Sequence, residues 1–200
     1  MSEIGSGAPS LRTPRLLLRR WRPEDRAPFA ALNGDPTVME HFPAPLTEAE
    51  SDALADRIEL ELATTGSGLW AVEVPGVAPF IGFIGLHPTD FDAPFTPAVE
   101  VGWRVDRPYW GQGYATEGAE AAVAFGFEHA GLEEIVSFTS RTNERSWRVM
   151  ARLGMITDPA EDFDHPRVAE GHPIRRHVLY RLRRSDWARR HNRSDAAAEG

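Results

Sequence analysis

The chain has 200 residues, of which 42% are hydrophobic and 26% are charged, and its formal net charge at pH 7 is −8. This composition is typical of one globular domain with a sizeable core. The chain has no cysteine, which excludes disulfides, thiolate metal sites and a cysteine nucleophile. The negative charge argues against a nucleic-acid-binding surface and suits an amine-bearing substrate.

The sequence contains no candidate membrane segment. No stretch approaches the roughly 18 consecutive apolar residues of a bilayer span. The first ten residues, MSEIGSGAPS, lack the basic and apolar regions of a secretory signal. We therefore expect a cytoplasmic protein without a membrane partner, with one domain over 11–184 and flexible tails over 1–10 and 185–200.

The first half of the chain predicts one strand followed by two helices. Residues 15–21 read RLLLRRW and have the apolar content of a strand that could be central in a sheet. A short helix over 24–33 follows. Thr47 and Glu50 have the three-residue spacing of a capping box, so we expect a second helix to begin at Thr47 and end near Gly66.

The second half predicts an antiparallel meander and then alternating strands and helices. A helix rich in small residues begins after Gly113 and stops at Gly131, and a later helix is closed by Gly154. The tail from Ser185 is expected to fray. The expected strands lie at 69–74, 80–86, 98–105, 135–139 and 177–182, and the later helix lies at 143–153. A meander combined with one strand-helix-strand crossover indicates an α/β fold with a mixed sheet.

One strand, turn and helix near the middle of the chain is suited to hold an anion. The strand VEVGWRV at 99–105 runs into DRPYWGQGYAT, which opens the small-residue helix. Gly111 and Gly113 remove side chains that would keep a ligand from the backbone, and the helix start offers unpaired N–H groups and partial positive charge. A pyrophosphate would fit there, although an isolated GxG is more often a simple helix entry turn. The turn is neither a P-loop nor the dinucleotide GxGxxG.

These residues resemble motif A of the GNAT superfamily of acyl-CoA-dependent N-acyltransferases. The family pattern Q/R-x-x-G-x-G/A corresponds to WGQGYA at 110–115, with Trp110 as the one departure. The run WGQGYATE is similar to the branch that contains the ribosomal-protein N-terminal alanine acetyltransferases. The resemblance continues through TNERS at 142–146 and VMARLGM at 149–155, and it covers roughly 11–183.

The resemblance implies a mixed, mostly antiparallel sheet flanked by helices, with a cleft where the strand at 98–105 splays from the strand at 135–139. It implies acetyl-CoA as the acyl donor and no metal. The pantetheine arm would pair with the splayed strand, and the pyrophosphate would lie on the glycine turn. The implied cofactor-binding residues are Trp103, Arg104, Val105, Gly111, Gln112, Gly113, Tyr114, Ala115, Thr116 and Asn143.

Acyl transfer needs a positioned amine, a route for its proton and a proton for the leaving thiolate. The resemblance makes Ser146 the candidate acid, where many family members have a tyrosine, and Glu100 the candidate base, acting directly or through water. Other interpretations stay open. Asn143 and Ser146 also have the spacing of an N-cap and its N3 residue, Glu100 could be a solvated strand residue, and Trp103 could belong to the core.

The acceptor is expected to be a primary amine, either a protein N-terminus or a small molecule such as an antibiotic, a polyamine or an amino acid. A module that binds acyl-CoA without chemistry is the alternative from another class. A strand edge near the C-terminus could mediate a homodimer. Three histidines at 165, 172 and 177 lack the spacing of zinc ligands. By fold analogy, candidates for the border of the acceptor cleft are His41, Phe42, Trp70, His87 and Phe91.

Overall fold

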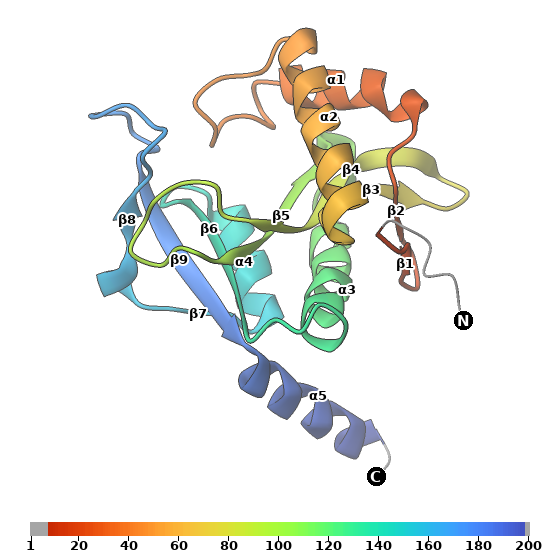
Figure 1. Ribbon diagram of the computed structural model, residues 1–200, viewed down its shortest axis with the longest axis vertical. Coiled ribbons are helices and arrows are strands. Elements are labelled where there is room, and N and C mark those ends of the chain that lie inside the picture. Colours follow the sequence, from red (N-terminus) through yellow and green to blue (C-terminus); the bar gives the residue numbers. More distant parts are fainter. Residues whose placement is uncertain (1–7, 199–200) are drawn as a thin grey trace. The chain divides into compact units, whose positions relative to one another are not determined.

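The computed structural model describes residues 8–198, with side chains for residues 8–192. The chain divides into two units, which are described separately below. Within the described residues, the first unit covers 8–87 and 101–123, and the second covers 88–100 and 124–198. Figure 1 labels the helices and strands of both units. The expected extent of the domain, 11–184, stays a prediction.

The first unit contains an antiparallel sheet, as the meander pattern predicted. Its strands neighbour one another in chain order, and β1 to β4 are joined by antiparallel pairs. The strands are β1 (Leu11–Arg12), β2 (Leu17–Arg19), β3 (Leu69–Val74), β4 (Ala78–Pro88) and β5 (Val99–Val105), whose first two residues belong to the second unit. The strand expected at 15–21 is therefore shorter than its apolar run. A further short strand, β1, precedes it at the edge of the sheet.

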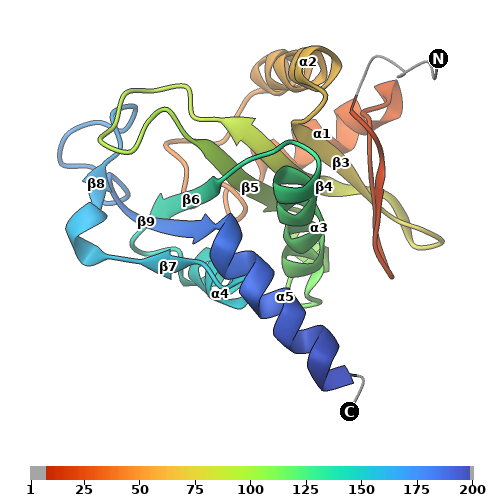
Figure 2. The same ribbon diagram turned by 60° about the horizontal axis from the view of Figure 1, so that its bottom comes forward.

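The helices of this unit are α1 (Arg26–Gly34), α2 (Glu48–Thr65) and the first part of α3 (Tyr114–Glu128). The predicted capping box begins α2, because the Thr47 hydroxyl accepts from the Glu50 N–H and the Glu50 carboxylate accepts from the Thr47 N–H. Gly66, at φ 74°, ends the helix. In Figures 1 and 2, α1 and α2 lie side by side.

Strand β4 carries helices on both of its faces. Phe83 packs edge-on against Phe29 of α1, with 6.0 Å between ring centroids. On α3, a Cβ at Gly118 would come within 2.5 Å of Ile84 Cδ1, so this helix lies close against the strand. Because neighbouring strand residues point to opposite faces, α1 and α3 cover opposite faces of β4. The small-residue stripe thus predicted the close approach of α3 correctly.

The second unit is built around the antiparallel pair of β6 (Glu134–Ser140) and β9 (Arg176–Arg183). Two short strands, β7 (Ile156–Thr157) and β8 (Phe163–Asp164), also pair with β9. Strand β5 joins β6 in parallel, with Glu100 opposite Val136. Antiparallel pairs dominate and one pair is parallel, so the predicted mixed α/β fold is confirmed. Helix α4 (Glu144–Leu153) begins after Asn143 and ends at Gly154, as the sequence predicted.

Aromatic side chains form the core of the second unit. Phe91, Phe95 and Phe138 pack against a buried cluster that includes Phe163. The rings of His165 and His177 join this cluster, 4.9 Å apart. Burial, together with the nearby His177 and Arg167, lowers the pKa of His165 to about 4, and burial also lowers the pKa of His177. Both rings are therefore neutral core groups at pH 7.

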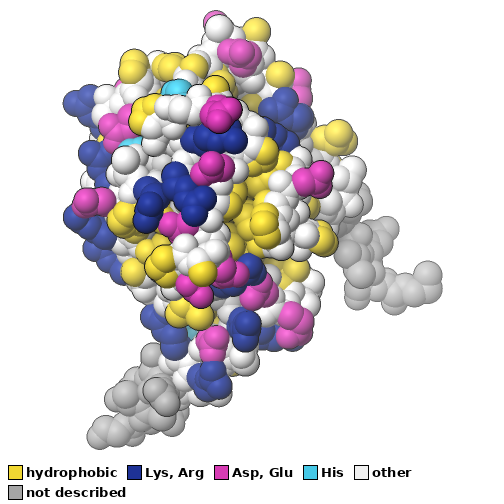
Figure 3. Space-filling view, turned by 90° about the vertical axis from the view of Figure 1, so that its left-hand side faces the viewer, with side chains coloured by type: hydrophobic (Ala, Val, Ile, Leu, Met, Phe, Trp, Pro, Cys, Tyr) yellow, Lys and Arg dark blue, Asp and Glu magenta, His cyan; other side chains and the backbone are white. Residues whose placement is uncertain are grey.

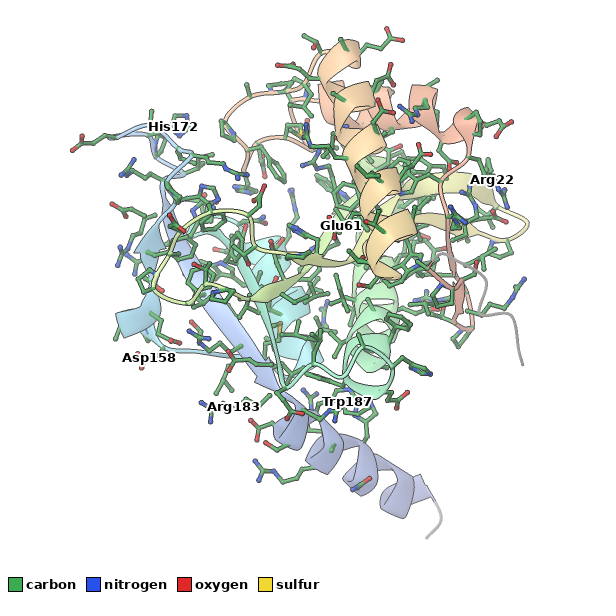
Figure 4. The ribbon with its side chains drawn as sticks, in the orientation of Figure 1. Arg22, Glu61, Asp158, His172, Arg183 and Trp187 are labelled. Carbon is green, nitrogen blue, oxygen red and sulfur yellow. The ribbon has the colours of Figure 1, made fainter. Side chains whose placement is uncertain are left out.

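The C-terminal segment is helical where the sequence led us to expect fraying from Ser185. Helix α5 (Arg184–Ala198) follows β9 directly. Trp187, labelled in Figure 4, packs against Phe127 with 5.4 Å between ring centroids, and the Arg190 guanidinium donates to the Arg152 carbonyl. These long-range contacts carry no local sequence signal. Residues 199 and 200 lie outside the described residues.

The expected N-terminal tail over 1–10 also differs from the structure where it is described. The Ala8 N–H donates to the Leu62 carbonyl at 3.1 Å, and the Trp70 indole donates to the Pro9 carbonyl at 2.8 Å. Residues 8–10 are thus tied to the first unit, and residues 1–7 lie outside the described part. Within residues 8–198, no helix has both the length and the apolar composition that a bilayer span requires.

A buried ion pair fixes the entry to α1, and its removal gives a first prediction. The side chains of Arg19 and Asp25 are 4% and 3% exposed, with 2.8 Å between Nη1 and Oδ2. We expect Asp25→Ala to lower the free energy of unfolding by about 3 kcal/mol, because it leaves a buried guanidinium only partly paired. Urea denaturation measures the loss. The matched control is Asp56→Ala, which removes a 69% exposed partner of Arg26 and should cost less than about 1 kcal/mol; equal losses would contradict the expectation.

Candidate active site

The strand, turn and helix that the sequence singled out are continuous, and the first unit holds their residues 101–123. After β5 ends at Val105, a short 3-10 helix, η2 (Arg107–Tyr109), leads to the glycine turn. The Trp110 indole donates to the Val105 carbonyl at 2.6 Å. The Asp106 N–H donates to the Ile81 carbonyl of β4 at 2.8 Å. These two bonds fix the turn to the end of β5 and to the neighbouring strand β4.

The two glycines of the turn have backbone conformations that other residues rarely adopt. Gly111 has φ 74° and Gly113 has φ 83°, and both are exposed. A Cβ at Gly111 would meet nothing within 4 Å, whereas one at Gly113 would lie 3.3 Å from Arg15 Nη2. The glycines are thus required by backbone angle and leave the amides uncovered.

The backbone N–H groups of the turn are available to a ligand. Among the described residues, no acceptor faces the N–H of any residue from Gly111 to Thr116. The first N–H bonded back within the helix is that of Glu117, which donates to the Gly113 carbonyl at 3.0 Å. Unpaired donors at a helix N-terminus, together with the helix dipole, form an anion-binding site.

Arg15, which the sequence did not single out, places a positive charge beside the turn. Its Nη1 donates to the Gln112 carbonyl at 2.8 Å, and its guanidinium lies 4.9 Å from the centre of the Tyr114 ring. Arg15 and Gln112 are 97 residues apart in the chain, so no local spacing could have joined them. The cation also stands beside the motif in which Trp110 replaces the family's arginine or glutamine.

Glu117 of α3 holds Arg15 in place. Its carboxylate accepts from the Thr13 hydroxyl at 2.6 Å, from the Arg15 backbone N–H at 2.9 Å and from the Arg15 guanidinium. Burial alone would raise the pKa of Glu117, but these hydrogen bonds outweigh it and lower the pKa below its ordinary value of 4.5. Glu117 is therefore a fixed anion at neutral pH.

The strand residues predicted to line the pantetheine differ in their side chains. Trp103 is half-buried and Val105 is buried, while Arg104 is only 9% exposed. The Arg104 Nη1 donates to Asn33 Oδ1 of α1. Its guanidinium lies 4.2 Å from the centre of the Phe42 ring. The resemblance assigned Arg104 to the site through its backbone, and a buried arginine side chain there was not expected.

The second unit carries Asn143 and Ser146 at the start of α4. Asn143 is the N-cap, and its Oδ1 accepts from the Ser146 N–H at 3.2 Å. Its Nδ2 donates to the Thr139 hydroxyl at 2.9 Å, which leaves one amide N–H. The Ser146 hydroxyl makes no hydrogen bond within the described part of the chain. The cap interpretation is thus confirmed for Asn143, while the hydroxyl of Ser146 is not used by the cap.

The other candidate residues lie in diverse environments. Glu100 is half-buried on β5, opposite Val136. Trp70 is fully buried, so the expectation that it borders an acceptor cleft is wrong.

His41 Nε2 lies 3.0 Å from the Glu40 carboxylate, and Phe42 is 38% exposed. His87 is half-buried in the first unit, and Phe91 packs in the aromatic core of the second unit.

A hollow of about 580 Å³ in the second unit is lined largely by charged side chains that pair with each other. Arg181 reaches both Glu161 and Glu134 there, at 2.7 and 2.6 Å, and Arg183 and Asp158, labelled in Figure 4, also line it. Figure 3 shows basic and acidic side chains interspersed on this side of the molecule. Within residues 8–192, no three His, Asp or Glu side chains are grouped to share a metal ion.

The model of the acetyltransferase (GNAT) domain family matches residues 15–156. The chain belongs to the GNAT acetyltransferase family. It is 34% identical to the FsC-acetyl coenzyme A-N(2)-transacetylase of Aspergillus fumigatus, over 90% of this chain and 79% of that protein. A GNAT-family acetyltransferase from Bacillus anthracis has the same fold, with a TM-score of 0.72 and 22% identity over 88% of this chain and 99% of that chain.

A second solved structure agrees with this assignment. The acetyltransferase from Agrobacterium tumefaciens matches with a TM-score of 0.70 and 25% identity, over 91% of this chain and 98% of that chain. The GNAT membership makes the protein an acyltransferase, and the fold and enzyme class predicted from the sequence are confirmed.

The Arg15–Glu117 contact gives a prediction about pH. Because the pKa of Glu117 is lowered in the folded state from its ordinary value of 4.5, the ionised carboxylate adds stability above that value, and this stability is lost as the pH falls through the lower folded value. We expect Glu117→Gln to be less stable than wild type at pH 7 and the difference to shrink below about pH 4. Thermal unfolding across pH 3–7 measures it. The exposed Glu120 of the same helix provides the control Glu120→Gln, and a difference independent of pH would contradict the expectation.

Proposed function

We propose that this GNAT acetyltransferase transfers the acetyl group of acetyl-CoA to a primary amine. The observation that carries the proposal is the row of unpaired N–H groups from Gly111 to Thr116 at the start of α3. Donors in this arrangement suit a pyrophosphate. The relative from Aspergillus fumigatus is named as an acetyl coenzyme A N(2)-transacetylase, which supports both the donor and a nitrogen acceptor.

Each unit has residues that suit one part of the donor. The pyrophosphate would lie on the amides of the turn, and Arg15, held by Glu117, would add a cation on the phosphate side. The pantetheine arm would pair as an added strand with the backbone of 103–105. Asn143 keeps one amide N–H beyond its cap and Thr139 bonds, and this donor would serve the cofactor.

The chemistry that follows is direct acyl transfer. The neutral amine attacks the thioester carbonyl, the C–N bond forms, and the C–S bond then breaks to release the thiolate of CoA. Backbone N–H groups on β5 would stabilise the oxyanion. Glu100 would take the amine proton, directly or through water. Ser146, whose hydroxyl is not used by the helix cap, would donate to the thiolate or relay a proton from water.

Two classes of acceptor suit this reaction. A protein N-terminus is suggested by the WGQGYATE resemblance, and a Vibrio cholerae protein proposed to be a ribosomal-protein-serine acetyltransferase has a similar fold at 16% identity. A small-molecule amine is the alternative within the fold. A non-catalytic acyl-CoA sensor is disfavoured because the turn, Asn143 and Ser146 are all present. Cytoplasmic location and a homodimer stay predictions.

The glycine turn gives a prediction with a matched control. Gly111 has φ 74° and Gly76, in the turn between β3 and β4, has φ 75°, and a Cβ would meet nothing within 4 Å at either. Glutamate at either position should lower the free energy of unfolding by about 1–2 kcal/mol, because the backbone at both positions is left-handed. We expect only Gly111→Glu to weaken acetyl-CoA binding, by at least about tenfold, because its carboxylate opposes the phosphates. Titration calorimetry measures the affinity.

The calorimetric comparison has two adverse outcomes. If acetyl-CoA binds Gly111→Glu as tightly as wild type, the proposal that the turn binds the pyrophosphate is refuted. Wild type that does not bind acetyl-CoA at all would refute the donor assignment.

Ser146 gives a kinetic prediction. We expect Ser146→Ala to lower kcat by about 10- to 100-fold, because a group that assists proton transfer is lost, with little change in KM for acetyl-CoA. The assay is thiol release from acetyl-CoA with a panel of N-terminal peptides, polyamines and amino acids. Ser185→Ala, an exposed serine on α5, is the control. An unchanged kcat would refute a role for Ser146 in proton transfer.

A further inference from the structure

Arg104 is a buried cation without a carboxylate partner. The residue is 9% exposed, and its only protein acceptor among the described residues is the side-chain oxygen of Asn33. Its Nε is buried and has no hydrogen-bond partner. The rings of Phe42 and Phe83 lie 4.2 and 5.3 Å from the guanidinium carbon. Aromatic faces attract a cation but do not neutralise it.

Two other arginines of the described residues, Arg181 and Arg19, have side chains that are 21% and 4% exposed, and they show what is missing. Arg181 uses the edge formed by Nε and Nη2 to grip Glu161, at 2.9 Å from Nε to Oε2 and 2.7 Å from Nη2 to Oε1. Arg19 is paired with both Asp25 and Glu73. The same Nε–Nη2 edge of Arg104 has no hydrogen-bond acceptor among the described residues, although its Nε is covered. A guanidinium edge matches the two oxygens of a carboxylate.

The charge of Arg104 persists although it is buried. Burial lowers the pKa of Arg104 to about 10, which still leaves the group protonated at pH 7. A buried charge that lacks its partner destabilises the fold. Such groups are found where a ligand supplies the missing charge.

Arg104 belongs to the strand on which the reaction is proposed to take place. It lies on the stretch of β5 whose backbone is proposed to pair with the pantetheine. Its contacts to Asn33 of α1 and to Phe83, whose ring packs on α1, place its side chain on the face of the sheet that α1 covers. Helix α3, which begins at the phosphate-binding turn, covers the opposite face of β4. An anion bound by Arg104 is therefore separate from the phosphates of the donor.

We propose that the Nε–Nη2 edge of Arg104 binds the carboxylate of the acceptor, so that the substrate is an amino acid or another amine that carries a carboxylate. This inference rests on the acetyl transfer proposed above and chooses between its two acceptor classes. A carboxylate held on β5 orients the amine of the same molecule toward the thioester.

Phe42 controls access to this edge. Because Nε is covered, the carboxylate reaches it only when a neighbouring side chain moves. Phe83 is 7% exposed and fixed in the core, whereas Phe42 is 38% exposed and lies on the connection between α1 and α2. The acceptor displaces the Phe42 ring and replaces its contact with an ion pair.

The test compares acids with their amides. Thiol release from acetyl-CoA is measured with the common amino acids, β-alanine and 4-aminobutanoate, and with the carboxamide of each. For wild type we expect kcat/KM to favour the best acid over its amide by at least about tenfold, the scale of one charge-assisted pair. In Arg104→Met the ratio should fall to about one. Arg104→Lys should be intermediate, because a point charge lacks the paired edge.

Two further variants keep the comparison specific. Arg57→Met removes one exposed positive charge on α2 and should leave the wild-type ratio unchanged. Arg104→Gln serves if the methionine variant does not fold. Acceptance confined to amides and blocked peptides overturns the proposal, as does a ratio that Arg104→Met leaves unchanged.

Calorimetry separates this proposal from the one on which it rests. Failure of wild type to bind acetyl-CoA would refute the proposed transferase reaction. Tight acetyl-CoA binding with thiol release only for carboxyl-free amines would refute the Arg104 site alone. A direct titration of the same amino acids into the CoA complex supplies a readout without turnover: binding to wild type that Arg104→Met loses supports the site, and no binding of any carboxylate overturns it.

Discussion

The candidate site depends on a row of backbone donors that must stay unpaired in a folded protein. Such donors at a helix start are normally capped by a side chain. Here the turn has glycine at 111 and 113, which adopts the positive φ and has no side chain to serve as a cap. The Trp110 indole and the Asp106 N–H then hold the turn to β5 and β4. The close seat of α3 on β4, which Gly118 permits, keeps the helix dipole directed at the turn.

Local pattern was sufficient for the elements whose cause is local. The capping box at Thr47, the glycine stop at Gly154 and the strand-like runs of the meander each specify an element within a few residues, and each was predicted. Arg15 and the helical C-terminus were not predicted, because their contacts join residues far apart in the chain, such as Arg15 with Gln112 at 97 residues. Arg104 is buried beside Asn33, which is 71 residues away. A charged residue in a predicted strand therefore did not indicate that its side chain would be buried.

Arg15 and Arg104 show two ways in which an acidic protein can hold positive charge. Arg15 is 49% exposed and neutralised by Glu117, so its field is short-ranged and its guanidinium serves as a fixed donor. Arg104 is uncompensated, and its low-dielectric surroundings strengthen any interaction with an anion. The two residues would therefore differ in selectivity. Arg15 would add one donor to the proposed phosphate site on the backbone amides, and Arg104 would distinguish acceptors that carry a carboxylate from those that do not.

The side chain of Arg190 on α5 packs directly against the C-terminal end of α4. The Arg190 guanidinium occupies the position that a Cβ at Gly154 would take, with only 1.1 Å between them, and it donates from there to the Arg152 carbonyl. Arg190 is exposed, and the atoms that a Cβ would meet are the far end of its flexible side chain. A side chain at residue 154 would therefore displace this guanidinium and cost its hydrogen bond to Arg152. A residue other than glycine at position 154 would therefore loosen α5 from the end of α4, and it would also have to adopt the φ of 80° that glycine has there.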